Sequence, residues 1–191
     1  MMKRVFDMII SGVCLVLFSP LFAVIAIAIR LEDGMPVIYK QERIGKHGKP
    51  FFIYKFRSMK VDAEKDGPNL LEVNGDPRLT KVGKFLREHH LDELPQLWNV
   101  LIGDMAFIGP RPERKFYIDQ IMEHDGRYPQ LYQIRPGVTS YATLYNGYTD
   151  TMEKMLRRLE LDLYYLEHRS WWFDLKILAK TFCNIVFGKK F

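Results

Sequence analysis

Two adjacent carboxylates, Asp92 and Glu93, are the residues of this sequence best suited to carry chemistry. A carboxylate can act as a nucleophile or as a ligand for Mg²⁺. Apolar residues recur at helical spacing over residues 91–101, and Pro95 belongs to the first turn of such a helix, so we predict that the pair lies at a helix N-terminus. The positive end of a helix favours the ionised form of an acid, which a nucleophile needs.

The same pair has a purely structural interpretation. Asp92 is a good helix cap and Glu93 interacts favourably with the positive helix end, which is worth about 0.5–2 kcal/mol. Consecutive helical residues point about 100° apart, however, so two adjacent acids do not both serve as one cap. The residues alone leave both interpretations open.

Basic residues beside rigid turns or strands form a second group. They are Lys55, Arg57, Arg87, Arg111 (between Pro110 and Pro112) and Arg135 (before Pro136-Gly137). Each of them alone is readily explained as a solvated surface cation. Together with the carboxylates they suit an anionic phosphate substrate, because the guanidinium fork matches the geometry of phosphate oxygens.

Composition and motifs exclude several other classes of protein. The 191 residues are 48% hydrophobic and 27% charged, which argues against intrinsic disorder, collagen and a polytopic membrane protein. The sequence contains no P-loop, no dinucleotide-binding glycine motif and no zinc-protease motif. The two cysteines lack the spacing of a metal site or a disulfide framework. A net charge of +5 does not argue for nucleic-acid binding, although it suits an anionic ligand or a membrane surface.

A long apolar segment, residues 5–29, precedes these candidate site residues. Asp7 is its only charge, and basic residues flank both of its ends. It can be a signal peptide, a straight spanning helix, or a re-entrant helix that enters and leaves the membrane on one face. Proline removes a backbone hydrogen bond, so Ser19-Pro20 predicts a kink, and Ser19 can satisfy a freed carbonyl group.

The kink favours the re-entrant arrangement. The arms on its two sides are about 21 Å and 15 Å long, and each is too short to span a hydrocarbon core of about 30 Å. Basic residues prefer the cytoplasmic side of a membrane, and here they lie at both ends of the segment.

The rest of the chain is predicted to form one unit. Residues 37–44 and 51–57 form a predicted β-hairpin, and amphipathic helices are predicted over residues 80–89, 91–101, 151–168 and 170–187. The last helix, with Trp171 and Trp172, is typical of a membrane interface, although a core helix fits its pattern as well. The predicted fold is α+β and mostly helical: a Pro-kinked re-entrant membrane helix (residues 1–30), then a compact domain (residues 31–191) with a small β-hairpin and C-terminal interfacial helices.

Several motifs resemble those of one known family. They are residues 54–59 (YKFRSM), 76–83 (DPRLTKVG), 91–100 (LDELPQLWNV), 103–105 (GDM), 109–113 (GPRPE) and 135–139 (RPGVT). With the Ser19-Pro20 break, they resemble, in the same order, the bacterial sugar transferase family, the small monotopic phosphoglycosyl transferases. The resemblance covers almost the whole chain. It departs after Thr139, where many members continue with a segment that contains Gln and Arg.

The resemblance implies a function. Members of the family sit in the inner (cytoplasmic) membrane of bacteria through a re-entrant helix, with the catalytic domain on the cytoplasmic face. They move a sugar-1-phosphate from a UDP-sugar to a polyprenol phosphate such as undecaprenyl phosphate, in the first membrane step of a surface glycan pathway. Asp92 would be the nucleophile that forms a covalent phosphosugar-aspartate and releases UMP, and Glu93 would be its dyad partner.

The resemblance also implies ligands for the other candidate residues. Asp92 would bind Mg²⁺; the phosphates would be bound by Lys55, Arg87 and Arg135; the nucleotide would lie near Pro110, Arg111 and Pro112. Cations are needed because an aspartate and a diphosphate repel each other by about 4 kcal/mol per pair of charges at 4 Å and an effective dielectric constant near 20. The expected partners are the UDP-sugar, undecaprenyl phosphate and membrane phospholipid, with a second copy of the chain as a further possibility and no nucleic acid.

Two other functions remain open at this stage. In the first, the chain is a membrane-anchored module that binds anionic lipid, and the carboxylates only cap a helix. In the second, transfer is direct, without a covalent intermediate, and Asp92 acts only on the metal.

Overall fold

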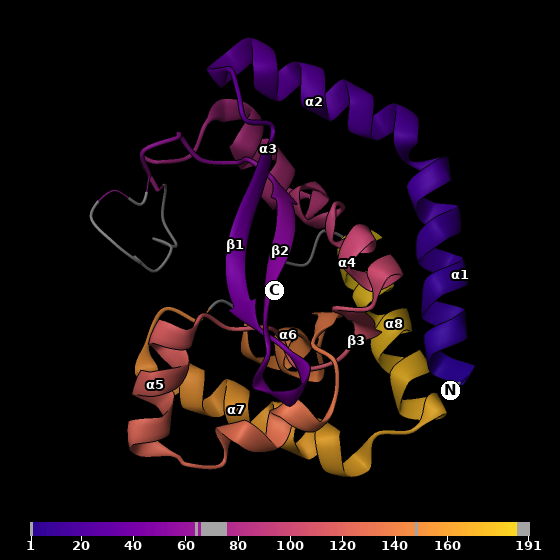
Figure 1. Ribbon diagram of the computed structural model, residues 1–191, viewed down its shortest axis with the longest axis vertical. Coiled ribbons are helices and arrows are strands. Elements are labelled where there is room, and N and C mark those ends of the chain that lie inside the picture. Colours follow the sequence, from indigo (N-terminus) through magenta and orange to yellow (C-terminus); the bar gives the residue numbers. More distant parts are fainter. Residues whose placement is uncertain (1, 64, 66–75, 148, 187–191) are drawn as a thin grey trace.

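The computed structural model describes residues 2–63, 65, 76–147 and 149–186. Its first two helices, α1 (Met2–Leu17) and α2 (Ser19–Asp33), meet at a bend of 60°. In Figure 1, α1 runs along one side of the molecule and α2 passes over its top. The predicted kink is confirmed.

The bend has a local cause at Pro20. Proline has no backbone N–H, so the carbonyl group of Val16, four residues earlier, loses its helical partner. The hydroxyl of Ser19 donates a hydrogen bond to this carbonyl at 2.8 Å. Ser19 therefore satisfies the group that Pro20 leaves unpaired, as the sequence predicts.

The helix pair is apolar on its outside. Within the described residues no single helix is long and apolar enough to cross a membrane, whereas α1 and α2 pass that test as a bent pair. Large apolar side chains of α1 are exposed, among them Val5, Ile9, Val13, Val16 and Leu17. The inner side of α2 contributes Ile25 and Ile29 to a buried cluster with Phe56 and Leu86.

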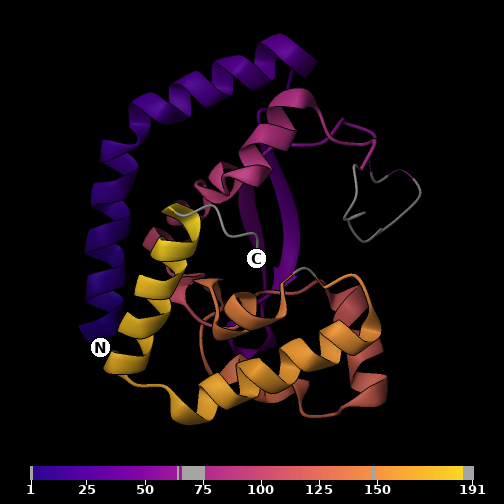
Figure 2. The ribbon, with the colours of Figure 1, turned by 180° about the vertical axis from the view of Figure 1, so that it is seen from behind.

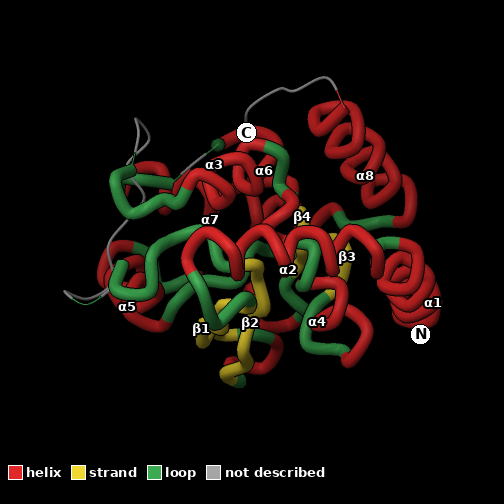
Figure 3. The backbone as a smooth tube through the Cα atoms, turned by 90° about the horizontal axis from the view of Figure 1, so that it is seen from above, coloured by secondary structure: helices red, strands yellow, loops and turns green. Residues whose placement is uncertain are grey.

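The predicted β-hairpin is confirmed. Strands β1 (Ile38–Ile44) and β2 (Pro50–Phe56) are antiparallel, with Tyr39 opposite Lys55, and the short 3₁₀ helix η1 (Lys46–Gly48) connects them. Figure 3, viewed from above, shows α2 crossing over the hairpin and α4. The hairpin thus lies under α2, while α4 packs directly against α1.

One predicted helix is interrupted. Helix α3 (Lys81–Glu88) is as expected, but residues 91–101 divide into a 3₁₀ turn, η2 (Leu91–Glu93), and a helix, α4 (Gln96–Ile102). His90 has a positive φ of 55°, which reverses the chain after α3. Pro95 has no N–H to donate to the carbonyl of Leu91, so an α-helix cannot run through it, and Pro95 becomes the N-cap residue of α4.

In the described part of the second half, the chain adds one strand pair, four α-helices and one 3₁₀ helix. These elements are β3 (Ala106–Ile108), α5 (Lys115–His124), η3 (Tyr128–Gln133), β4 (Gly137–Thr139), α6 (Tyr141–Asn146), α7 (Met152–His168) and α8 (Trp171–Val186). Strands β3 and β4 pair in parallel. Met155, Leu159 and Leu163 of α7 pack into the largest core cluster, which confirms the amphipathic helix predicted over residues 151–168.

Helix α8 returns to the N-terminal helix. Figure 2 shows α8 beside α1, and the rings of Phe6 and Trp171 are 6.1 Å apart. Ile177 is buried, whereas Trp171, Trp172 and Phe182 are exposed. The helix therefore has one packed face and one exposed apolar face, and the prediction for residue 187 lies outside the described residues.

Candidate active site

Asp92 and Glu93 lie on η2, between the C-terminal end of α3 and the start of α4. Neither caps α4, because its N-cap residue is Pro95 and no side chain makes a capping hydrogen bond there. The interpretation of Asp92 as a helix cap is therefore wrong. The chain reversal at His90 and the break at Pro95 hold both acids on a short turn of their own.

Glu93 is bound by two cations from distant parts of the chain. Lys55 on β2 and Arg111 in the loop after β3 both donate to its Oε1, at 2.7 Å and 3.0 Å. Burial opposes the charge of Glu93, but Lys55 and Arg111 outweigh it and hold the pKa of Glu93 well below its usual range. Glu93 is thus a permanently ionised anchor for both cations.

Asp92 has a different environment, although it is the neighbouring residue. It is 5% exposed, and burial raises its pKa against the opposing charges of Lys55 and Arg87, while the charge of Glu93 adds to the rise. The expectation that the local structure favours the ionised form of Asp92 is wrong, because burial outweighs the nearby cations. The two carboxylates are therefore unequal: Glu93 is held in two ion pairs, and Asp92 is a buried carboxyl group whose charged form burial disfavours.

Lys55 and Arg111 depend on Glu93 in turn. Burial lowers the pKa of the Lys55 ammonium group, and Glu93 opposes this effect. The charge of Glu93 raises the pKa of Arg111. Removing Glu93 would leave two largely buried cations without their carboxylate.

Asn99 fixes α4, and with it η2, against β2. Its side chain is fully buried, accepts a hydrogen bond from the backbone N–H of Tyr54 at 3.1 Å and donates to the carbonyl of Phe52 at 2.7 Å. Lys55 follows Tyr54 directly, so this amide sets the distance between the lysine and the acidic turn.

The loop that carries Arg111 is held from both sides. The carbonyl of Pro110 accepts a hydrogen bond from the N–H of Gly137 at 2.9 Å. Glu113 binds Arg43 and Arg158, the latter at 2.9 Å. These contacts connect the loop to β4, to β1 and to α7, so Arg111 projects from a rigid segment.

Asp162 on α7 lies behind this loop and is 1% exposed. Burial raises its pKa to about 7, against the opposing effects of Arg158 and of the backbone N–H groups of Arg111 and Ala142. A buried carboxyl group with a pKa near neutrality therefore faces the backbone N–H of Arg111 from inside the core.

Arg87 faces the acidic turn from α3. Its Nε donates to the hydroxyl of Ser58 at 2.9 Å, and among the described residues its buried Nη1 has no hydrogen-bond partner. Its charge acts on Asp92, so the structure brings Lys55, Arg87 and Arg111 together around the two acids, as the sequence predicts.

Two of the predicted basic residues lie elsewhere. Arg135 donates from Nε to the carbonyl of Gly103 at 2.7 Å, which is at the opposite end of α4 from Asp92. Arg57 binds the carbonyl groups of Asp33 and Gly34 at the end of α2, at 2.8 Å and 3.0 Å. Arg57 fastens the helix pair to β2, and the role predicted for Arg135 in phosphate binding remains a prediction.

An apolar groove of about 610 Å³ runs beside the acidic turn. Its lining comes from α1, α2, the hairpin and the start of α4: Leu15, Phe22, Ala23, Ala26, Val37, Ile38, Tyr54, Phe56, Pro95 and Trp98. Tyr54 is next to Lys55, and Pro95 is two residues from Glu93. The groove therefore lies on the face of β2 opposite Lys55, and it reaches the chain just after the acidic turn at Pro95.

Comparison with known proteins gives the family. The model of the bacterial sugar transferase family matches residues 1–188. The chain belongs to the bacterial sugar transferases. It is 43% identical over 183 residues to the UDP-glucose:undecaprenyl-phosphate glucose-1-phosphate transferase of Escherichia coli (strain K12), an alignment that covers 95% of this chain and 39% of that protein.

Other bacterial sugar transferases are similar to this chain along nearly its whole length. The UDP-N-acetylgalactosamine-undecaprenyl-phosphate N-acetylgalactosaminephosphotransferase of Aeromonas hydrophila is 40% identical over 186 residues, which cover 97% of this chain and 44% of that protein. An uncharacterized sugar transferase of Bacillus subtilis (strain 168) is 39% identical over 180 residues, covering 94% of this chain and 85% of that protein. This sugar transferase thus spans about two fifths of the length of the first two relatives.

The donor set of this sugar transferase is compatible with Mg²⁺. Among the described residues, no group of three or more His, Cys, Asp or Glu side chains is arranged to hold a metal ion. Mg²⁺ is usually bound by one or two carboxylates together with substrate phosphates and water, rather than by a cage of protein groups. Asp92 fits that mode, because the two cations of the site bind Glu93 and leave the Asp92 oxygens unengaged by them.

The sequence analysis missed three residues of this site. Asn99 and Asp162 support it from the core, and Gln96 in the first turn of α4 is buried, with an Nε2 that lacks a hydrogen-bond partner among the described residues. The helical spacing of residues 91–101 could have indicated Gln96, because it places this residue about one turn after Asp92. Asp162 carried no such signal, since an acid on a predicted helix is most simply a solvated one.

Proposed function

We propose that this chain transfers a sugar-1-phosphate from a UDP-sugar to undecaprenyl phosphate through a covalent intermediate on Asp92, as a first membrane step of a bacterial surface glycan pathway. The proposal rests on the difference between the surroundings of the two acids. Glu93 holds Lys55 and Arg111 by direct hydrogen bonds, and Asp92 lies beside these cations without being bound by them. The activities for which the Escherichia coli and Aeromonas hydrophila relatives are named support these substrates.

The first step forms a mixed anhydride. An oxygen of the Asp92 carboxylate attacks the phosphorus that carries the sugar, the bond from that phosphorus to the bridging oxygen breaks, and UMP leaves with the electron pair. Lys55, Arg87 and Arg111 offset the repulsion between the acid and the diphosphate, because each interacts with negative charge at the site. In the second step an oxygen of undecaprenyl phosphate attacks the same phosphorus and restores the Asp92 carboxylate.

Mg²⁺ at Asp92 is part of the proposal. When bound, it would neutralise charge on the diphosphate oxygens. Arg111 and Pro110-Pro112 border the site on the side of the nucleotide, and Arg87 Nη1 is a donor available to a phosphate oxygen. Phosphate binding by Arg135, whose Nε binds the carbonyl of Gly103, stays a prediction.

The apolar groove is the proposed entry for the lipid substrate. The two N-terminal helices line it together with the hairpin and with Pro95, two residues after Glu93, and an isoprenoid chain lying in it would bring its phosphate toward the acidic turn. Apolar side chains alone line most of it, which suits a hydrocarbon and not a sugar nucleotide.

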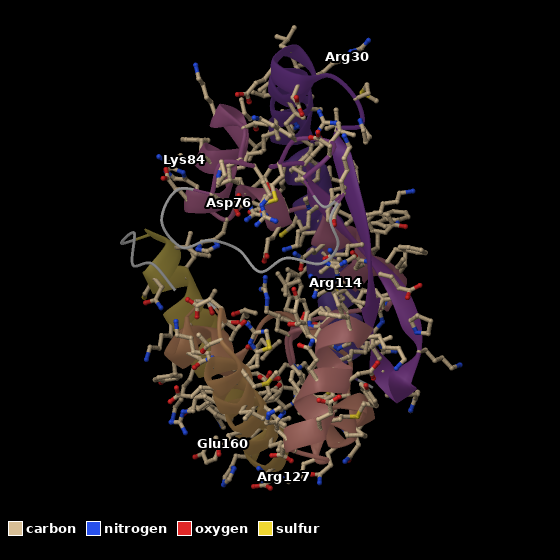
Figure 4. All side chains as sticks on the ribbon, turned by 90° about the vertical axis from the view of Figure 1, so that its left-hand side faces the viewer. Arg30, Asp76, Lys84, Arg114, Arg127 and Glu160 are labelled. Carbon is tan, nitrogen blue, oxygen red and sulfur yellow. The ribbon has the colours of Figure 1, made fainter. Side chains whose placement is uncertain are left out.

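We also propose that α1 and α2 enter the inner membrane and return to its cytoplasmic face. Both ends of the pair are tied to the same body: Lys3 binds Asp174 at 2.6 Å, and the carboxylate of Glu32 accepts the backbone N–H groups of Lys81 and Val82 at 2.7 Å and 2.8 Å. A straight spanning helix would separate these ends by the thickness of the bilayer. Figure 4 shows Arg127 and Glu160 at the end of the molecule opposite Arg30 of α2, which leaves that charged end facing water.

The test is a reaction without lipid. Purified protein incubated with Mg²⁺ and a panel of labelled UDP-sugars should release one UMP per protein and retain the sugar phosphate on Asp92. UDP-glucose and UDP-N-acetylgalactosamine are the first to try, because two relatives are named as transferases that use them. Asp92→Asn should release none, and EDTA should stop the wild-type reaction.

The two alternative functions give different results. Direct transfer requires undecaprenyl phosphate before any UMP appears. Turnover by Asp92→Asn would show that Asp92 is not the nucleophile. A lipid-binding module gives no turnover with both substrates present. The premise that the acids only cap a helix has no support in the geometry of α4.

A further inference from the structure

Among the described residues, the side chain of Arg87 forms a hydrogen bond with one other side chain, that of Ser58. Its Nε donates to the hydroxyl of Ser58 at 2.9 Å, and Nη1 is buried and unpaired among the described residues. The guanidinium group is planar with a fixed fork of donors, so a bond at Nε determines where the two Nη groups point. The Ser58 hydroxyl therefore sets the direction of the Nη1 donor.

Ser58 is itself held firmly. It is 6% exposed, and its backbone carbonyl accepts a hydrogen bond from the N–H of Thr80 at 3.2 Å. Gly83 of α3 lies directly on it: a Cβ atom at position 83 would be 1.9 Å from the carbonyl oxygen of Ser58. Only a glycine allows this approach, which places the last turn of α3, and thus Arg87, within reach of the hydroxyl.

The preceding residue gives the same segment a second fixed point. Arg57 is 5% exposed and binds the carbonyl groups of Asp33 and Gly34. The backbone of residues 57 and 58 is therefore fastened to α2 on one side and to α3 on the other. The hydroxyl of Ser58 has little freedom to follow Arg87 if the arginine moves.

We propose that Ser58 is a positioning residue, which aims Nη1 of Arg87 at the diphosphate of the sugar nucleotide bound next to Asp92. The inference rests on the proposed function, because it names the ligand of that same site. Ser58 touches neither substrate nor Asp92 and acts through Arg87. Two features of the position are needed: a hydroxyl acceptor at 58 and no side chain at 83.

The test is a double-mutant cycle on nucleotide binding. UDP-sugar KM and kcat are measured from UMP release, and binding of UDP by calorimetry, for Ser58→Ala, Arg87→Gln and the double variant. Ser58→Ala should raise KM and weaken UDP binding by about 3- to 10-fold, the worth of one hydrogen bond, with a smaller change in kcat. The double variant should match Arg87→Gln within about twofold, because the serine has nothing left to aim.

Ser11→Ala is the matched control. Ser11 is also a fully buried serine with one backbone hydrogen bond, to Met8, but it lies on α1. It should leave KM and UDP binding within about twofold of wild type. If Ser58→Ala does not fold, Ser58→Cys keeps the size of the side chain with a much weaker acceptor and should show the same loss.

Three results would overturn the inference. They are additive effects of the two substitutions, a loss of thermal stability in Ser58→Ala without a change in KM or UDP binding, and a wild-type protein that does not bind UDP. Failure of the proposed function looks different, since the protein would then bind UDP with the expected coupling but release no UMP from any UDP-sugar.

Discussion

Neighbouring acids on one short turn have separate duties because their partners differ. Glu93 receives Lys55 and Arg111 on one oxygen, whereas Asp92 meets the same cations only through space. Without Glu93, Asp92, the proposed nucleophile, would be free to form a salt bridge with one of these cations. Glu93 prevents this by holding the cations at a fixed distance from Asp92.

At the residue scale, Glu93→Gln should therefore cost both stability and activity. The variant leaves Lys55 and Arg111 largely buried without a carboxylate, which typically costs about 3–5 kcal/mol. Urea unfolding should show this loss, and UMP release should fall by at least about 100-fold. Glu160→Gln is the control: its pair with Arg157 is mostly exposed and should contribute well under about 1 kcal/mol. Equal losses in the two variants would contradict the anchoring role of Glu93.

Asp162 gives a prediction for pH. Burial raises its folded-state pKa to about 7, above the value near 3.8 of the unfolded chain, so between pH 4 and 7 the folded protein binds a proton that the unfolded chain has lost. This carboxyl group therefore lowers the free energy of unfolding as the pH rises through that window, by up to about 4 kcal/mol. In Asp162→Asn that decrease is absent, so the variant should gain stability relative to wild type from pH 5 to pH 8 in chemical unfolding. A constant difference across this range would show that Asp162 is ionised throughout.

The sequence predicted the members of the site better than their contacts. Asp92, Glu93, Lys55, Arg87 and Arg111 do come together, because each sits at a turn or strand that the local pattern already indicated. Lys55 and Arg111 share one oxygen of Glu93 because of how β2, η2 and the loop after β3 pack. The local sequence around each residue does not predict this packing. Arg135 illustrates the same limit, since a motif next to Pro136-Gly137 does not reveal which end of α4 it reaches.

At the scale of elements, the site is assembled by α4 and β2. Asn99 is the link, because its amide pairs with the backbone of Tyr54 and Phe52 on the strand that carries Lys55. Helix α4 is short, and its preceding turn holds both acids. The packing of α4 on β2 thus determines the distance between the two acids and Lys55.

Asn99→Leu should uncouple the two elements. Two buried backbone groups of β2 lose their partner, which we expect to cost about 2–4 kcal/mol in urea unfolding, and kcat should fall as Lys55 and Glu93 separate. Asn146→Leu is the control, because the Asn146 amide binds only the carbonyl of Lys154, away from the acids. Loss of stability in Asn99→Leu with normal kcat would show that β2 and η2 keep their spacing without it.

Element prediction succeeded where the cause was local. The kink at Pro20, the hairpin and α3 follow from a missing N–H, from alternating β-rich segments and from the Thr80 cap on Gly83. The helix predicted over residues 91–101 is confirmed only from Gln96 onward, because Pro95 has no N–H for the carbonyl of Leu91 and so interrupts a segment of good apolar spacing. Strands β3 and β4 have three residues each and pair across about 30 positions, so they leave no periodic signal.

At the scale of the whole molecule, the helix pair and the catalytic body form one structure. Ile25 and Ile29 of α2 pack on Phe56 and Leu86, and α8 lies along α1. The apolar groove is lined by both the pair and the body, so the proposed lipid substrate would contact both of them.

The proposed topology is tested by chemical labelling. In a variant without the two native cysteines, Cys14→Ser and Cys183→Ser, single cysteines introduced at positions 2 and 35 should react with a membrane-impermeant maleimide from the same side of sealed vesicles. Pro20→Ala restores an N–H for Val16 and should straighten the pair, which moves one label toward the other side. Labelling of the two positions from opposite sides in the wild-type sequence would rule out a return of the helix to one face.

The ion pair between Lys3 and Asp174 joins positions 171 residues apart. A ribosome adding about 5–20 residues per second makes the acid roughly 10–35 seconds after the lysine. During that interval Lys3 lacks this partner, and a chain that stops before α8 never gains it. The contact between the start of α1 and α8 therefore forms only once Asp174 has been made, so a truncation before α8 should leave α1 without this ion pair.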